Sequence, residues 1–127
     1  MIERGASDMN TGLYFAAEAG KKAIMQLMVE KGANDLNKAL RGASIFGDIS
    51  IMEWVCEQGA TDYNEALYSA CYGGEKAVRF LLEKGATNVD AALDLACKRN
   101  NLAVIKILLE YNADPNILHD YPHINLK

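Results

Sequence analysis

The sequence predicts an all-α solenoid of stacked helix–turn–helix repeats, and three observations support this fold class. A Gly-Ala dipeptide recurs at a nearly constant interval, apolar residues recur at helical spacing within each interval, and glycine or asparagine separates the apolar segments. Self-similarity at such a fixed period is typical of repeat architectures, in which neighbouring units bury a shared core. We therefore expect one domain built from a repeated unit.

The Gly-Ala dipeptides set the boundaries of the units. They start at residues 5, 32, 59 and 85, and Asn112-Ala113 continues the series at intervals of 27, 27, 26 and 27 residues. The expected single domain, 1–127, divides into a partial second helix at 1–4, four repeats at about 5–31, 32–58, 59–84 and 85–111, and a C-terminal cap or partial repeat at 112–127. The chain thus begins midway through a unit, either as a fragment of a longer array or with the stub as its own cap.

The first helix of each unit is marked by a leucine and an alanine three residues apart, such as Leu40 and Ala43, which share one helical face. A polar residue shortly before each leucine is expected to cap the helix by accepting from its free amide groups. These residues are Asn10, Asn37, Asn64 and Asp90. Glycine or asparagine then ends the helix, because these residues tolerate a left-handed backbone.

The second helix of each unit carries a separate apolar stripe. In the second unit the stripe is Ile51, Met52, Val55 and Cys56, and in the fourth it is Leu102, Ile105, Leu108 and Leu109. Trp54 falls among such residues, with Leu27, Phe80 and Ile107 at matching positions, and is expected to pack in the core or between units. Helices this short are unstable alone in water, so each pair must stack on the next.

These patterns resemble the ankyrin repeat. Residues 38–62 reproduce the family's spacing of leucine, alanine and glycine, and the segment 112–116, Asn-Ala-Asp-Pro-Asn, is similar to the family's Gly-Ala-Asp-Pro-Asn. The resemblance covers residues 5 to about 116. It implies a non-catalytic module that binds a partner protein through the concave surface formed by the first helices, here called helix A. The partner itself is not identified by the sequence.

The repeats are shorter than the roughly 33 residues of the family. The missing residues fall where the family has a projecting β-hairpin, and the Thr-Pro-Leu-His tetrapeptide is absent. The chain therefore resembles shortened arrays found in large DNA viruses of amoebae. That resemblance implies a viral protein that lies in the cytosol of the host cell. A protein of another origin is expected to be cytoplasmic, or to lie in the host cytosol if it comes from an intracellular pathogen.

The partner-binding candidates are the helix A residues outside the Leu/Ala stripe. They include four aromatic residues and an arginine, residue types that are enriched in binding hot spots. The candidates are Tyr14, Glu18, Arg41, Ile45, Phe46, Tyr68, Tyr72, Asp94 and Lys98. The alternative is that some of these rings pack locally beneath the shortened loops.

The composition argues against several other functions. The net charge is −4 and the basic residues are scattered, which disfavours nucleic-acid binding. No apolar run is long enough to span a membrane. The odd number of cysteines, with no C-x-x-C spacing, disfavours disulfides or zinc, and we expect free buried thiols. His119 and His123 lie four residues apart, but no third metal ligand is suggested beside them, so no metal site is predicted. No catalytic residue and no cofactor are predicted either.

Two other functions are compatible with the repeats. The array is either a structural spacer or the substrate-recruiting arm of a larger enzyme or ubiquitin-ligase adaptor. A monomer is favoured, although an uncapped first unit would expose apolar surface that another copy could cover.

The stacking register makes a prediction for the central leucine of unit three. Leu67→Ala is expected to lower the free energy of unfolding by about 2–5 kcal/mol, because it removes buried methyl groups and leaves a cavity. Urea denaturation measures this change. A loss below about 0.5 kcal/mol, the size expected for a surface substitution, would contradict the register.

Overall fold

The computed structural model describes residues 2–72 and 74–126, with side chains from Asp8 onward. The described chain contains α-helices and one 3-10 helix, and no strand. The elements are α1 (Ile2–Glu18), α2 (Lys22–Glu30), α3 (Leu36–Phe46), α4 (Ile49–Glu57), α5 (Tyr63–Ala70), α6 (Glu75–Lys84), α7 (Val89–Lys98), α8 (Leu102–Glu110) and the 3-10 helix η1 (Pro115–Asp120).

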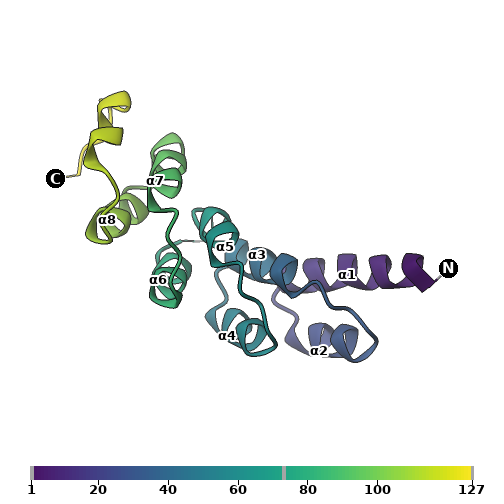
Figure 1. The fold of residues 1–127 in the computed structure, drawn as a ribbon. Helices are drawn as coiled ribbons and strands as arrows, with labels where there is room; N and C mark the ends of the chain where they lie inside the picture. The colour runs from purple at the N-terminus through teal and green to yellow at the C-terminus, as the bar shows by residue number, and fades with distance from the viewer. Residues whose placement is uncertain (1, 73, 127) are drawn as a thin grey trace.

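The helices form two rows, as predicted for an all-α repeat solenoid. Figure 1 shows α1, α3, α5 and α7 side by side in one row, the helix A row, and α2, α4, α6 and α8 in the other, the helix B row. The stack bends so that the helix A row lies on its inner side and η1 follows at the C-terminal end (Figure 1). This geometry confirms the predicted fold class.

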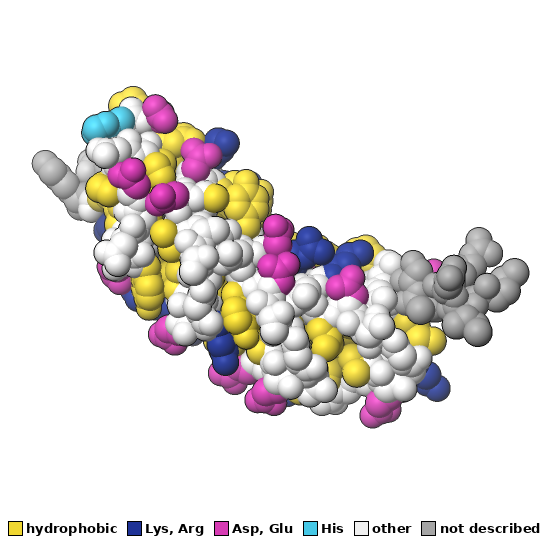
Figure 2. Space-filling model, viewed as in Figure 1, with side chains coloured by type: hydrophobic (Ala, Val, Ile, Leu, Met, Phe, Trp, Pro, Cys, Tyr) yellow, Lys and Arg dark blue, Asp and Glu magenta, His cyan; other side chains and the backbone are white. Residues whose placement is uncertain are grey.

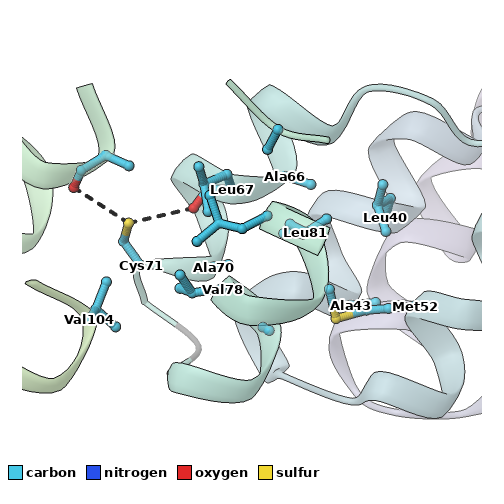
Figure 3. Packing of buried hydrophobic residues seen from close by; sticks show 14 of the residues in the cluster. Leu40, Ala43, Met52, Ala66, Leu67, Ala70, Cys71, Val78, Leu81 and Val104 are labelled. Carbon is cyan, nitrogen blue, oxygen red and sulfur yellow. Dashed lines mark hydrogen bonds between the residues drawn. The ribbon is translucent and has the colours of Figure 1, made fainter. Parts of the chain in front are cut away.

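The Leu/Ala stripe of helix A forms the centre of the core. Leu40, Leu67 and Leu93 are fully buried, and so are the alanines three residues after them. Small alanines let neighbouring helices approach closely, while the leucines fill the space between the two rows. Figure 3 shows Leu40, Leu67 and Leu81 packed with Ala43, Ala66 and Ala70 from adjacent units. The predicted stripe is therefore confirmed.

The predicted helix ends also occur, with the left-handed backbone that glycine and asparagine tolerate. Gly47 ends α3 at a φ of 81°, and Gly85 ends α6 at 110°. Asn100 and Asn112 take these roles in the fourth unit, with φ values of 54° and 72°. Asparagine adopts this conformation more readily than other residues with a side chain, because it can bond locally.

The predicted capping residues do not cap their own helices. Asp35 and Asp62 are the N-cap residues of α3 and α5, and their carboxylates accept from the backbone N–H groups of Lys38 and Glu65. Asn37 lies two residues later, inside the first turn of α3. The same residue types favour a cap and a side-chain bond to a distant backbone, so the sequence placed the cap two residues too late.

The residues predicted as caps instead join successive units. The amide oxygen of Asn37 accepts from the backbone N–H groups of Thr61 (2.9 Å) and Asp62 (3.1 Å) in the next unit. Asn10, Asn64 and Asp90 make equivalent bonds of 2.7–3.0 Å to Asn34 and Asp35, to Thr87, and to Asp114. We call these four residues the asparagine ladder. Each one fixes the turn that precedes the following helix A.

The first helix A is longer than those of the later units. Within the described residues, α1 is continuous over residues 2–18, so no turn separates residues 2–4 from the rest of this helix. In later units, the turn backbone is bound by an Asn or Asp about 24 residues earlier. At positions 7 and 8 the backbone forms the helical hydrogen bonds of α1 instead.

The spacing between helix A neighbours depends on one variable position. Gly42 of α3 is buried, and a Cβ added there would lie 2.9 Å from the carbonyl oxygen of Tyr14 in α1. The same position holds Leu95 in α7, and α7 makes a smaller contact with α5 than α3 makes with α1. A glycine therefore allows the close approach in the first half of the stack, which leucine prevents in the second half.

The helix B stripe is confirmed at most predicted positions and wrong at two. Ile51, Met52 and Val55 are buried and Cys56 is half-buried, whereas Leu102 is 38% exposed at the start of α8. Leu27, which matches Trp54 in the first unit, was expected to pack in the core or between units, but it is 49% exposed. In α8 the buried set is Val104, Ile105, Ile107 and Leu108, because this helix packs against both α6 and α7.

The asparagine ladder predicts a stability difference between two substitutions at one position. Asn37→Ala removes an acceptor from two backbone N–H groups, so the free energy of unfolding should fall by about 1–2 kcal/mol. Asn37→Asp keeps an acceptor oxygen, as Asp90 does in the fourth unit, and should stay within about 0.5 kcal/mol of the wild type. Urea denaturation distinguishes the two. Equal stability of Asn37→Ala and the wild type would contradict the role assigned to the ladder.

Candidate partner-binding surface

Three of the predicted aromatic residues are exposed on the helix A side of the stack. Tyr68 in α5 is 43% exposed, Tyr72 just beyond α5 is 49% exposed, and Phe46 at the end of α3 is 59% exposed. Figure 2 shows hydrophobic side chains over α5 and charged side chains over the neighbouring α3. An exposed tyrosine offers a large apolar ring together with a hydroxyl that can donate a hydrogen bond.

The remaining candidates in the first two units are half-buried. Tyr14 contacts Phe15 edge to face, and the ammonium group of Lys38 lies 5.4 Å from the centre of the Tyr14 ring. Burial and the nearby Glu18 carboxylate raise the pKa of Tyr14. Arg41 and Ile45 are also half-buried. These side chains are therefore less accessible to a partner than the three exposed rings.

Arg99 joins the surface although the sequence analysis did not select it. Its guanidinium group lies 4.1 Å from the centre of the Tyr72 ring. Arginine stacks on aromatic rings through a cation–π interaction, which holds both side chains in place. The alignment of the repeats could have identified Arg99, because it occupies in the fourth unit the position that Phe46 occupies in the second.

The C-terminal segment covers part of α7. The hydroxyl of Tyr121 donates to the carboxylate of Asp94, which also forms an ion pair with Lys98 at 3.2 Å. The apolar residues of this segment pack against the core, and η1 contacts α7, a helix A element. Asp94 therefore lies at an intramolecular contact, while Lys98 remains exposed.

The hydrogen bond between Tyr121 and Asp94 shifts the pKa values of both groups. It is the main cause that raises the pKa of Tyr121 to about 12, and the main cause that lowers the pKa of Asp94. The hydroxyl proton is shared with a carboxylate, so removing it would place two negative charges side by side. The contact is therefore strongest with a neutral tyrosine and an ionised aspartate.

A polar hollow lies beside the turns that begin units three and four. It has a volume of about 210 Å³ and is lined by Thr61, Asp62, Tyr63, Asn64, Gly85 and Thr87. Asn64 and Thr87 are already hydrogen-bonded to each other across this hollow. Its polar groups therefore mainly hold the turns together.

The cysteines lie in packed surroundings. Cys71 and Cys97 are buried, as predicted, and the Cys71 thiol donates to the Leu67 carbonyl at 3.5 Å (Figure 3). Burial raises the pKa of Cys71 to about 11 and also raises that of Cys97. A thiol is nucleophilic only as the thiolate, so these residues contribute packing. Over the described residues, no group of three His, Cys, Asp or Glu residues could hold a metal ion.

Comparison with known families identifies the repeat. The family model described as ankyrin repeats (3 copies) matches residues 40–119, which is 80 of the 127 residues. The chain belongs to the ankyrin-repeat family. Ankyrin repeats are generally protein–protein interaction modules and are typically non-catalytic. No curated protein matches the chain. Among the described helices, none is long and apolar enough to cross a membrane.

The Tyr121 contact predicts a titration that depends on Asp94. The raised pKa means that the folded chain keeps the Tyr121 proton above pH 10, where an unfolded chain loses it. The stabilisation is therefore complete below pH 10 and is lost as the pH rises towards 12. The lowered pKa of Asp94 gives the opposite limit, because its stabilisation is lost as the pH falls below about 4.

Asp94→Asn should return the pKa of Tyr121 towards 10. An alkaline titration followed by tyrosinate absorbance measures this change, because Tyr121 contributes one of the six tyrosines to the absorbance. Asp120→Asn is the matched control, because Asp120 contributes less to the shift. Identical alkaline titrations for wild type and Asp94→Asn would contradict the contact.

Proposed function

We propose that this ankyrin-repeat chain binds a partner protein through the helix A surface centred on Tyr68, Tyr72 and Phe46. The observation that supports this surface best is the exposure of these three rings, which are 43%, 49% and 59% exposed. Aromatic residues are enriched in binding hot spots, because they bury a large area at a small cost in conformational entropy. The stack also bends around this side (Figure 1).

Charged residues around the rings supply orientation in this proposal. Arg41 and Glu18 lie towards the N-terminal side, and Lys98 and Arg99 lie towards the C-terminal side. Arg99 stacks on Tyr72, so the ring is already ordered before a partner arrives. Ordering a side chain in advance lowers the entropy cost of binding. Asp94 takes part only if the C-terminal segment remains in place beside it.

We also infer that the units are a shortened form of the repeat. The connections from helix B to the next helix A are short, with residues 31–35 joining α2 to α3 and 58–62 joining α4 to α5. A chain this short has no room for a projecting hairpin. Partner contacts then come mainly from helix A side chains, which places more of the specificity on the aromatic residues.

Affinity capture with matched variants tests the proposed surface. Wild type, Tyr68→Ala/Tyr72→Ala and Leu102→Ala are compared as baits, since Leu102 is exposed on the helix B side. A partner of this surface is recovered by wild type and Leu102→Ala, and its recovery falls at least about tenfold with the double variant, as for loss of a hot spot. Circular dichroism confirms that all three baits are folded.

The captured protein is then purified, and its affinity for each variant is measured by calorimetry. Equal affinity for the wild type and the double variant would move the binding site to the turns or to helix B. Failure of every bait to retain a specific protein would favour the structural-spacer function instead.

A further inference from the structure

The stacked pair of Arg99 and Tyr72 joins the fourth and third units on the helix A surface. The central carbon of the Arg99 guanidinium group lies 4.1 Å from the centre of the Tyr72 ring, and both residues are exposed. A stacked guanidinium group keeps its N–H donors at its planar edge, where they can bind a carboxylate through two parallel hydrogen bonds. The ring therefore holds a cation in place without neutralising its charge.

A second arginine lies on the other side of the exposed tyrosines. Neither Arg41 nor Arg99 forms an ion pair with any residue that the structure describes. Arg41 lies in α3 and Arg99 follows α7, while α5, which carries Tyr68, packs between these two helices. Figure 2 shows Lys and Arg side chains on both sides of the hydrophobic side chains over α5, with acidic side chains among them. The exposed rings are thus flanked by two cations that have no carboxylate partner.

The acidic residues of the helix A surface leave these two cations available. Asp94 accepts a hydrogen bond from Tyr121 and forms an ion pair with Lys98 at 3.2 Å. Glu18 lies in α1, beside Tyr14. Glu65 is exposed in the first turn of α5, at the opposite end of that helix from the stacked pair. A carboxylate for the stacked arginine must therefore come from outside the described chain.

We propose that the helix A surface binds an acidic, extended segment of the partner protein, with carboxylates on Arg99 and Arg41 and apolar side chains on the tyrosine rings between them. This inference rests on the proposed function and names the chemistry of the partner. Packed helices lie 8–10 Å apart, so α3 and α7 are roughly 16–20 Å apart. About six residues of extended chain cover this distance. The two acidic residues of the segment are therefore expected about six positions apart.

The charge of the whole chain favours a protein segment over a nucleic acid. The net charge is −4, so a ligand that carries a negative charge on every monomer is repelled along most of its length. A segment with two carboxylates and apolar residues between them places its charges only at the two arginines. Because Tyr72 already orders Arg99, binding costs less side-chain entropy there.

Three peptides of equal length test the charge of the partner segment. The acidic probe is Asp-Pro-Leu-Pro-Leu-Pro-Asp, acetylated and amidated to remove the terminal charges, with prolines that favour an extended chain. The neutral and basic probes carry Asn or Lys in place of both Asp residues. Amide shifts in the NMR spectrum of the chain give the affinity and the location. The acidic probe should bind with a Kd on the order of 100 µM and shift α3, α5 and α7.

The acidic probe should bind at least about fivefold more tightly than the neutral probe, because it makes charge-assisted hydrogen bonds. Arg99→Gln should remove about the same factor from the affinity for the acidic probe and leave the affinity for the neutral probe unchanged. Arg79→Gln is the matched control, because Arg79 is an exposed arginine of α6 in the helix B row. It should bind all three probes like the wild type.

Four results would each overturn the acidic segment. These are equal or tighter binding of the neutral or basic probe, no shifts in α5 and α7 at about 1 mM acidic probe, unchanged binding by Arg99→Gln, and tighter binding of an oligothymidine of the same length. The wild-type shift map stands even if a variant is unfolded.

Affinity capture separates this inference from the proposed function. A partner that is lost with Tyr68→Ala/Tyr72→Ala but bound normally by Arg41→Gln/Arg99→Gln would overturn the acidic segment and leave the binding surface in place. A partner that is bound normally by both double variants would overturn the surface itself.

Discussion

The asparagine ladder is the interaction on which the regular stacking of this protein depends. Each ladder residue lies in the first turn of one helix A and binds backbone N–H groups of the turn before the next helix A. These bonds join residues 23–25 positions apart, so they couple each unit to its neighbour. A repeat protein in which contacts run only between neighbours draws its stability from such interfaces. The ladder sets the register of neighbouring units, and the Leu/Ala stripe fills the space between them.

Variation within this frame changes the geometry along the stack. Gly42 lets α3 lie close against α1, whereas Leu95 holds α7 further from α5. At the contact between α5 and α7, Arg99 from the fourth unit also stacks on Tyr72 from the third. The cation–π contact therefore spans the place where the helix A packing is least extensive. A single repeat position thus influences both the shape of the stack and the arrangement of its exposed aromatic side chains.

The repeated and the variable positions have separate roles. Leucine, alanine and the ladder residues recur because they form the interfaces, and they leave little freedom for recognition. The variable helix A positions carry Phe46, Tyr68 and Tyr72, whose rings remain exposed although Arg99 stacks on the Tyr72 ring. Asp94 is also at a variable position, but its carboxylate makes an intramolecular contact, because it accepts a hydrogen bond from Tyr121 of the C-terminal segment. An ankyrin-repeat chain can therefore keep its backbone while its surface chemistry varies.

The sequence by itself determined the repeat, the paired helices, the left-handed helix ends and the buried Leu/Ala stripe, because these depend on spacing and local backbone preference. It selected Asn37 as important but assigned it to the wrong bond, since a side chain suited to capping can equally bind a turn 24 residues away. Only the tertiary structure decided which apolar residues are covered: Leu27 is exposed and Ile107 buried at equivalent positions. Burial depends on whether a neighbouring unit lies against the helix, and that is a property of the stack.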